Sequence, residues 1–101
     1  MLLPLDGPSA QGTVTVNDST VQEAKAGGST LSDRKVITMQ GDGKFYVYFG
    51  DGGSAPSVAT VQNHGFTQFK NAIQSYEAGE QQKVYVLALS GSVNVKVAER
   101  G

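Results

Sequence analysis

Few residues of this chain have the types that metal or cofactor chemistry requires, and they are widely separated. His64 is the only histidine and the chain has no cysteine, so the ligands that complete a zinc site are missing. Asp42 and Asp51 could bind calcium together with loop carbonyl oxygens, but this ion takes about six to eight oxygen ligands, and turn chemistry explains both aspartates. We therefore predict neither a bound metal nor a cofactor.

Acidic pairs and hydroxyl groups are the remaining candidates for catalysis. The carboxylate pair of a glycosidase could be Glu77 with Glu80. Another such pair is Asp33 with Asp51, but nothing in either spacing fixes the distance between the two groups. The loop Gly50–Ser54 lacks the ending of a phosphate-binding loop, and no serine lies in a Gly-x-Ser-x-Gly motif. The sequence thus predicts a protein that is not an enzyme.

Length and charge indicate a single soluble domain. The chain has 101 residues, and its eight Lys and Arg against nine Asp and Glu leave no basic surplus for a nucleic-acid backbone. The apolar stretch at residues 1–5 is too short for an export signal and lacks a basic segment. No apolar run reaches the roughly 20 residues of a membrane helix. We expect no nucleic-acid partner, no membrane partner and synthesis in the cytosol.

Most of the sequence has the composition and alternation of β-strands. One predicted hairpin joins residues 36–40 to residues 44–49 through Gly41-Asp42-Gly43, where the Asp-Gly pair supplies the positive φ of a tight turn. A second predicted hairpin turns at Ser90-Gly91, and alternate residues of its last strand, such as Val95, are directed inward. Shorter strands are predicted in three further segments, namely residues 58–61, 66–69 and 72–76.

These patterns favour an all-β fold, a small antiparallel β-sandwich and possibly a jelly roll. The one segment with helical composition, residues 21–26, is too short for a stable isolated helix, so an edge strand or irregular backbone is predicted there. Residues 13–101 are predicted to form the single domain, and residues 1–12 an extended N-terminal arm. The arm residues predicted to contact a partner are Leu2, Leu3, Pro4 and Leu5.

The two most apolar strands are hydrophobic at odd and even positions alike. They are Phe45–Phe49 and Val84–Leu89, and because successive side chains of a strand point to opposite faces, each needs cover on both sides. We predict that another copy or another protein supplies this cover, with Tyr46, Tyr48 and Tyr85 in the oligomer interface. Two alternatives are cover by a loop or the N-terminal arm, and a platform on which sugars stack.

The order of these segments resembles a small β module of tailed-bacteriophage head proteins. The resemblance begins at Asp33, covers about two thirds of the chain and is a pattern of strand chemistry with no invariant catalytic residue. In those modules an Arg-Lys strand precedes a Val-Tyr-x-Gly strand, a late Val-Tyr-x-Leu/Ile-x-Ala strand and a final Val-x-Val strand near Glu-Arg. The matching segments here are residues 33–40, Val47–Gly50, Asn63–Phe66, Lys83–Ala88 and Val93–Arg100.

The resemblance implies a capsid decoration, or cement, protein. Such modules are β-sandwich or jelly-roll subunits, commonly trimers, that lie on the outer surface of the phage head and clamp the major capsid protein. It implies a homo-oligomer, with a trimer favoured, made in the host cytoplasm and located on the virion. This chain lacks a fibre-like extension, which favours decoration over a fibre. The alternative is a carbohydrate-binding or host-attachment module of a head fibre or adhesin, using Tyr46 or Tyr48 with Asp42 or Asn63.

Overall fold

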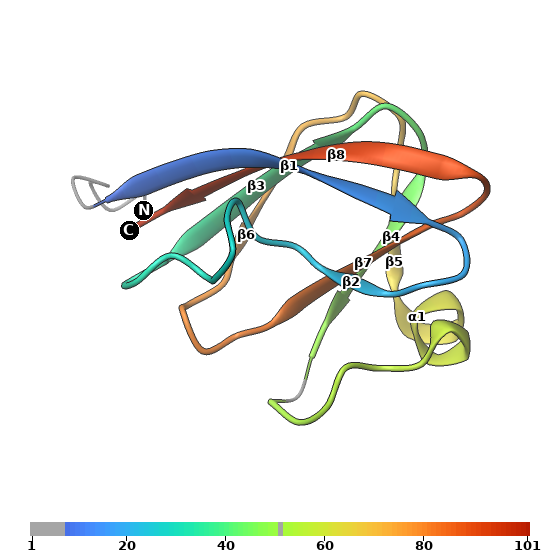
Figure 1. Cartoon of the computed structure of the whole chain (residues 1–101), viewed down its shortest axis with the longest axis horizontal. Coiled ribbons are helices and arrows are strands. Elements are labelled where there is room, and N and C mark those ends of the chain that lie inside the picture. Colours follow the sequence, from blue (N-terminus) through green and yellow to red (C-terminus); the bar gives the residue numbers. More distant parts are fainter. Residues whose placement is uncertain (1–7, 51) are drawn as a thin grey trace.

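Two antiparallel sheets pack face to face in the computed structural model, which describes residues 8–50 and 52–101 (Figure 1). The first sheet contains, in spatial order, β1 (Ser9–Asn17), β8 (Ser92–Arg100), β3 (Val36–Gly41) and β6 (Gln74–Glu77). The second contains β2 (Gln22–Glu23), β7 (Val84–Ala88), β4 (Phe45–Phe49) and β5 (Phe66–Gln68). One helix, α1 (Val58–His64), completes the described elements. The predicted antiparallel β-sandwich is confirmed.

Alternation along the strands builds the core between the sheets. In β8, Val93, Val95 and Val97 are buried while Asn94 and Lys96 are exposed, as predicted, because neighbouring side chains of a strand point to opposite faces. The other inward-facing strand residues of the core cluster follow the same rule. They are Val16, Ile37, Met39, Phe45, Val47, Val84, Val86 and Ala88.

The predicted hairpin of β3 and β4 is wrong, because these strands belong to different sheets. β3 pairs with β8 and β6, whereas β4 pairs with β7 and β5. Among the described glycines, positive φ occurs at Gly52 and Gly91 and not at Gly43, so the tight hairpin turn is absent. Gly41 instead allows a close crossing, since a Cβ there would lie 2.7 Å from Cε1 of Phe45.

The second predicted hairpin is also wrong, for the same reason. β7 and β8 lie in opposite sheets, and the chain crosses between them at Gly91, whose φ of 62° is the left-handed conformation expected of glycine. At the neighbouring crossing, Asp42 accepts hydrogen bonds from the backbone and the side-chain amide of Asn94, at 2.9 and 3.3 Å. The two crossings therefore lie side by side and are tied together.

The first strand begins earlier than predicted. β1 pairs with β8 from Ser9 onward, with Ser9 opposite Arg100 and Gly12 opposite Val97. Residues 9–12 therefore belong to the sheet and not to an arm, because the full length of β8 offers them a partner. The rest of the predicted arm, residues 1–7, lies outside the described residues. β2 is an edge strand, in agreement with the prediction for residues 21–26.

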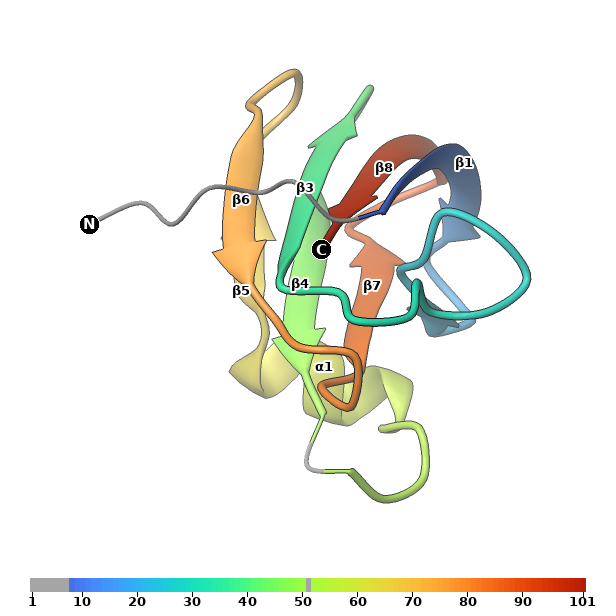
Figure 2. The same cartoon turned by 90° about the vertical axis from the view of Figure 1, so that its left-hand side faces the viewer.

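Residues 58–61 form the first part of a helix and not the predicted strand. Ser57 caps α1, since its Oγ accepts a hydrogen bond from the backbone nitrogen of Thr60 at 3.2 Å, which satisfies one of the free amides of a helix start. The helix packs against β4 and β7 of the second sheet (Figure 2). Val61 is its fully buried residue.

This helix explains how the two-sided apolar strands are covered. All five residues of β7 are buried, but Tyr85 and Leu87 do not belong to the core cluster between the sheets. They point to the outer face of the second sheet, where α1 contacts β7 and β4. A Cβ on Gly50 would lie 2.8 Å from the ring of Tyr85, so the segment after β4 also packs there. The chain itself therefore covers Tyr85 and Leu87 on this face, whereas Tyr46 and Tyr48 of β4 are half-buried.

A buried ion pair connects the last strand to two loops. Arg34 and Glu99 are 2 % and 0 % exposed, with 2.9 Å between Nη1 and Oε2. Glu99 also accepts hydrogen bonds from the backbone nitrogens of Ala26 and Leu31. Arg34 donates to three carbonyl oxygens of the loop between β6 and β7, those of Ala78, Gly79 and Gln82. The pair therefore orders two loops that form few regular pairings of their own.

We predict that Glu99→Ala lowers the free energy of unfolding by about 3–5 kcal/mol, because it leaves the Arg34 charge buried and unpaired. Urea denaturation measures this change. Arg100→Ala is the matched control on the same strand, and because Arg100 is exposed we expect a change within about 0.5 kcal/mol. Equal losses in the two variants would contradict this role of the ion pair.

Candidate interaction surface

The predicted interface tyrosines differ in exposure. Tyr85 is 5 % exposed and is covered by its own chain, so its place in an oligomer interface is corrected: a buried ring offers almost no surface to another copy. Tyr46 and Tyr48 are half-buried on β4. The predicted capsid contacts Leu2, Leu3, Pro4 and Leu5 lie outside the described residues.

The exposed apolar surface lies elsewhere, on β5 and the segment that joins it to β6. Among the described residues, the large hydrophobic side chains that are exposed are Phe66, Phe69 and Ile73, at 66 %, 61 % and 65 %. All three fall within eight consecutive residues, 66–73. We call this group the edge cluster. Its concentration on one segment distinguishes it from the scattered apolar residues that most surfaces carry.

Two sheet edges meet at the edge cluster. β5 is the last strand of the second sheet and β6 the last strand of the first. Gln68 links them, because its side-chain Nε2 donates to the carbonyl oxygens of Met39 and Ala72, and its Oε1 accepts from the Tyr76 hydroxyl at 3.0 Å. The ring of Phe49 meets Tyr76 edge-on, with 5.5 Å between centroids. This closes the seam between the sheets with polar and aromatic contacts.

Phe66 is exposed although the register of β5 places it opposite a buried residue. Gln68 is opposite Phe45 and Phe66 is opposite Val47, so both side chains are on the inner face of the sheet. Gln68, the last residue of β5, is buried, whereas Phe66, its first residue, is exposed. Phe69 follows the strand and lies 5.4 Å from the Nζ of Lys44, a cation–π contact.

The outer side of β6 has free backbone groups. Ala78 donates its backbone N–H to Lys35 across the β3–β6 ladder. Because hydrogen-bonding direction alternates along an antiparallel strand, Tyr76 and Gln74 also direct their backbone groups to β3, while those of Ser75 and Glu77 point away from it. The described strand that pairs with β6 is β3. Figure 2 shows β6 on the outer side of β3.

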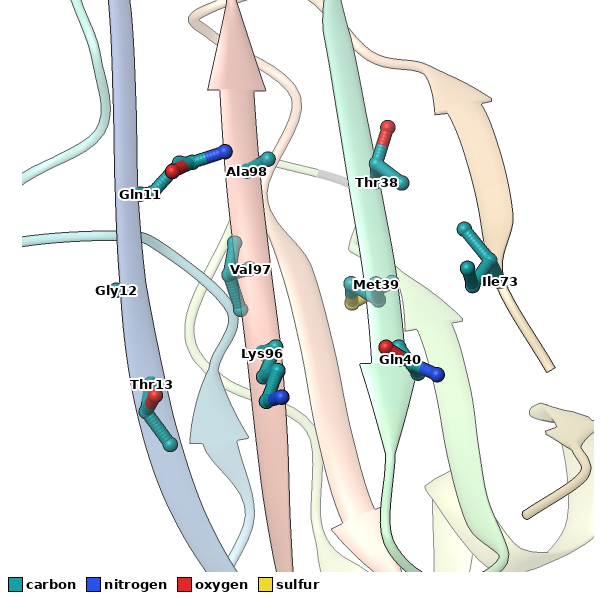
Figure 3. A pocket seen from close by; sticks show the side chains of 10 residues that line it. All are labelled: Gln11, Gly12, Thr13, Thr38, Met39, Gln40, Ile73, Lys96, Val97 and Ala98. Atoms are coloured by element: carbon teal, nitrogen blue, oxygen red, sulfur yellow. The ribbon is translucent and has the colours of Figure 1, made fainter. Parts of the chain in front are cut away.

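A shallow groove crosses the outer face of the first sheet and ends at the edge cluster (Figure 3). Its floor is at Ala98, a small residue between Gln11 of β1 and Thr38 of β3. The side chains of Thr13, Lys96 and Gln40 lie opposite one another in the next row across the sheet and bound the groove, which extends to Ile73. Its other lining residues are Gly12, Met39 and Val97.

The candidate catalytic and metal-binding residues have structural roles or lie apart. Asp42 binds Asn94, and Glu80 accepts the backbone N–H of Asp33 at 2.9 Å. His64 is exposed in the last turn of α1. Asp51 lies outside the described residues. Within the described ranges, no three His, Cys, Asp or Glu side chains are grouped so that they could hold a metal ion.

Sequence reasoning did not identify the edge cluster, although a signal was present. Phe66 and Phe69 are three residues apart, and in a strand such a spacing directs side chains to opposite faces. One of the two therefore had to leave the core. The sequence pattern alone predicts only a short apolar strand at residues 66–69.

Comparison with models of protein families, with curated proteins and with solved structures finds no match to this chain. None of the helices among the described residues has the length and apolar character needed to cross a membrane.

We predict that stability decreases at alkaline pH through Tyr76. Burial raises the pKa of the Tyr76 hydroxyl above its ordinary value of 10.0, so the folded state retains this proton more tightly than the unfolded state. Its contribution is complete below pH 10 and is lost as the pH rises through the folded pKa. In urea denaturation, the stability difference between the wild type and Tyr76→Phe should shrink above pH 10. Parallel pH profiles for the two proteins would contradict this.

Proposed function

We propose that this chain is a virion structural protein that decorates the outer surface of a phage head. The segment pattern from Asp33 to Arg100 supports this proposal. The Arg34–Glu99 ion pair gives a physical reason why this pattern has a charged residue near its start and another near its end. The observation that carries the proposal is the edge cluster: a small sandwich presents its exposed large hydrophobic residues, among those described, within eight consecutive residues. Such a surface suits assembly with other subunits.

The N-terminal segment is the proposed contact with the major capsid protein. Pro8 is fixed beside the chain's other end, because its carbonyl oxygen accepts the backbone N–H of Gly101 at 2.9 Å. Leu2, Leu3, Pro4 and Leu5 precede this anchor point. Seven residues reach at most about 25 Å when extended, so the arm can contact a surface outside the sandwich.

Many weak contacts would be sufficient for this function. Copies bound at repeated positions of a lattice, and joined to one another, stabilise it together even when each contact is modest. The resemblance favours a trimer, made in the host cytoplasm before it joins the virion. The proposal includes no enzymatic activity.

We predict that deleting residues 1–7 abolishes co-sedimentation with capsids but leaves the protein folded, because β1 begins at Ser9. The triple substitution of Leu2, Leu3 and Leu5 by serine should have the same effect at full chain length. Circular dichroism checks the fold, and a particle-binding assay measures occupancy. If either variant decorates capsids at full occupancy, the arm is not the capsid contact.

Carbohydrate binding is the second candidate, supported by the groove on the first sheet. Its rim holds amide, hydroxyl and ammonium groups, including Gln11, Gln40 and Lys96. Tyr46 and Tyr48 lie on the second sheet, outside this groove, and their half-buried rings offer a separate surface for sugars. A glycan array with purified protein distinguishes the two candidates. Saturable binding that is lost in Tyr46→Ala or Gln40→Ala would favour the carbohydrate-binding module over the decoration protein.

A further inference from the structure

We propose that two copies of this chain associate through the edge strand β6. The β6 strands of the two copies pair antiparallel about a two-fold axis centred at Ser75. This deepens the proposed function by naming the surface through which copies join. It rests on that function only in expecting self-association, and not on capsid binding; the two-fold contact replaces the trimer that the resemblance favours. The proposal is argued from three features of the described residues: a free sheet edge, an exposed apolar cluster beside it, and the charges at the two ends of β6.

The free edge supplies the main-chain contacts. Ser75 and Glu77 direct their backbone N–H and C=O groups away from β3. A second strand placed there would receive these bonds and extend the first sheet across two subunits, which is the usual way in which an edge strand binds another chain. In the register centred at Ser75, Ser75 lies opposite its own copy and Ile73 lies opposite Glu77 of the second copy.

The charges favour the antiparallel arrangement. Lys70 precedes β6, whereas Glu77 ends it and Glu80 follows it, and all three residues are exposed. An antiparallel pair brings the basic end of each strand to the acidic end of the other, while a parallel pair would place like charges together. Because the same patch then contacts itself, the contact closes after two copies.

The edge cluster supplies the apolar surface. Ile73 directly precedes β6, and Phe66 and Phe69 belong to the neighbouring edge of the second sheet, to which Gln68 ties β6. A two-fold axis at β6 places Ile73 beside the strand of the second copy, where its exposed side chain loses contact with water. The alternative is that β6 is protected against pairing, since short edge strands with nearby charges often are.

A single-cysteine cross-link tests the proposed register directly. The chain has no cysteine, so Ser75→Cys introduces one thiol per copy. Hydrogen-bonded residues that face each other on antiparallel strands have Cα atoms about 5.5 Å apart, within the range that a disulfide spans. Under mild oxidation, we expect Ser75→Cys to form a covalent dimer at least tenfold faster than Thr13→Cys. The latter is the matched control, an exposed residue on β1 at the opposite edge of the same sheet.

Light scattering of the wild-type protein gives an independent measurement. We expect the mass of a dimer, and we expect Ile73→Asp to weaken self-association at least tenfold while circular dichroism remains unchanged, because Ile73 is exposed. A monomeric or trimeric mass, or equal cross-linking of the two cysteine variants, would overturn the proposal. None of these measurements involves capsids, so the dimer and the capsid function can fail separately.

Discussion

The fold depends on a charge pair that is buried inside a small protein. Glu99 comes from the long central strand β8, and Arg34 from the loop before β3; together they provide hydrogen-bond partners for backbone groups of two loops. Removing two charges from water carries a desolvation cost that offsets much of the attraction between them. We therefore attribute to the pair a role in specifying one arrangement of these loops and not a large net gain in stability. Among the described residues, no buried side-chain nitrogen or oxygen is left without a partner.

The second constraint is the cover of the outer face of the second sheet. Tyr85 and Leu87 need a neighbour there, and α1 with the segment after β4 provides it within the same chain. We therefore expect contacts between copies at the edge cluster and not at the aromatic strands. The surface through which we propose that copies meet is therefore beside β6, at the side where both sheets end.

Local patterns in the sequence predicted the elements better than their pairing. Alternation in Val93–Val97 correctly predicted a half-buried strand, and the all-β sandwich followed from such strands. The two hairpins were wrong because Gly41 and Gly91 permit a crossing between sheets as readily as a turn within one, and only the packing of distant strands decides between these. α1 was missed although Ser57 is a helix cap, because four residues of strand composition follow it.

The candidate site was less predictable than the fold. Phe66 is exposed although it is opposite the buried Val47, and this depends on how distant strands pack and not on a local pattern. The roles of Arg34 and Glu99 required the same information, since 65 positions separate them in the sequence. Both charged residues lie in the segments that carry the resemblance, but only the structure shows that they meet.

Native-state hydrogen exchange tests the central claim about the buried pair most directly. The backbone amides of Ala26 and Leu31 lie in a loop and donate to Glu99, so the account predicts that they exchange as slowly as the amides of β8. In Arg34→Met they should become fast while the sheet amides stay protected. Fast exchange of both loop amides in the wild-type protein would contradict the account, because the pair would then not hold the loops that it contacts.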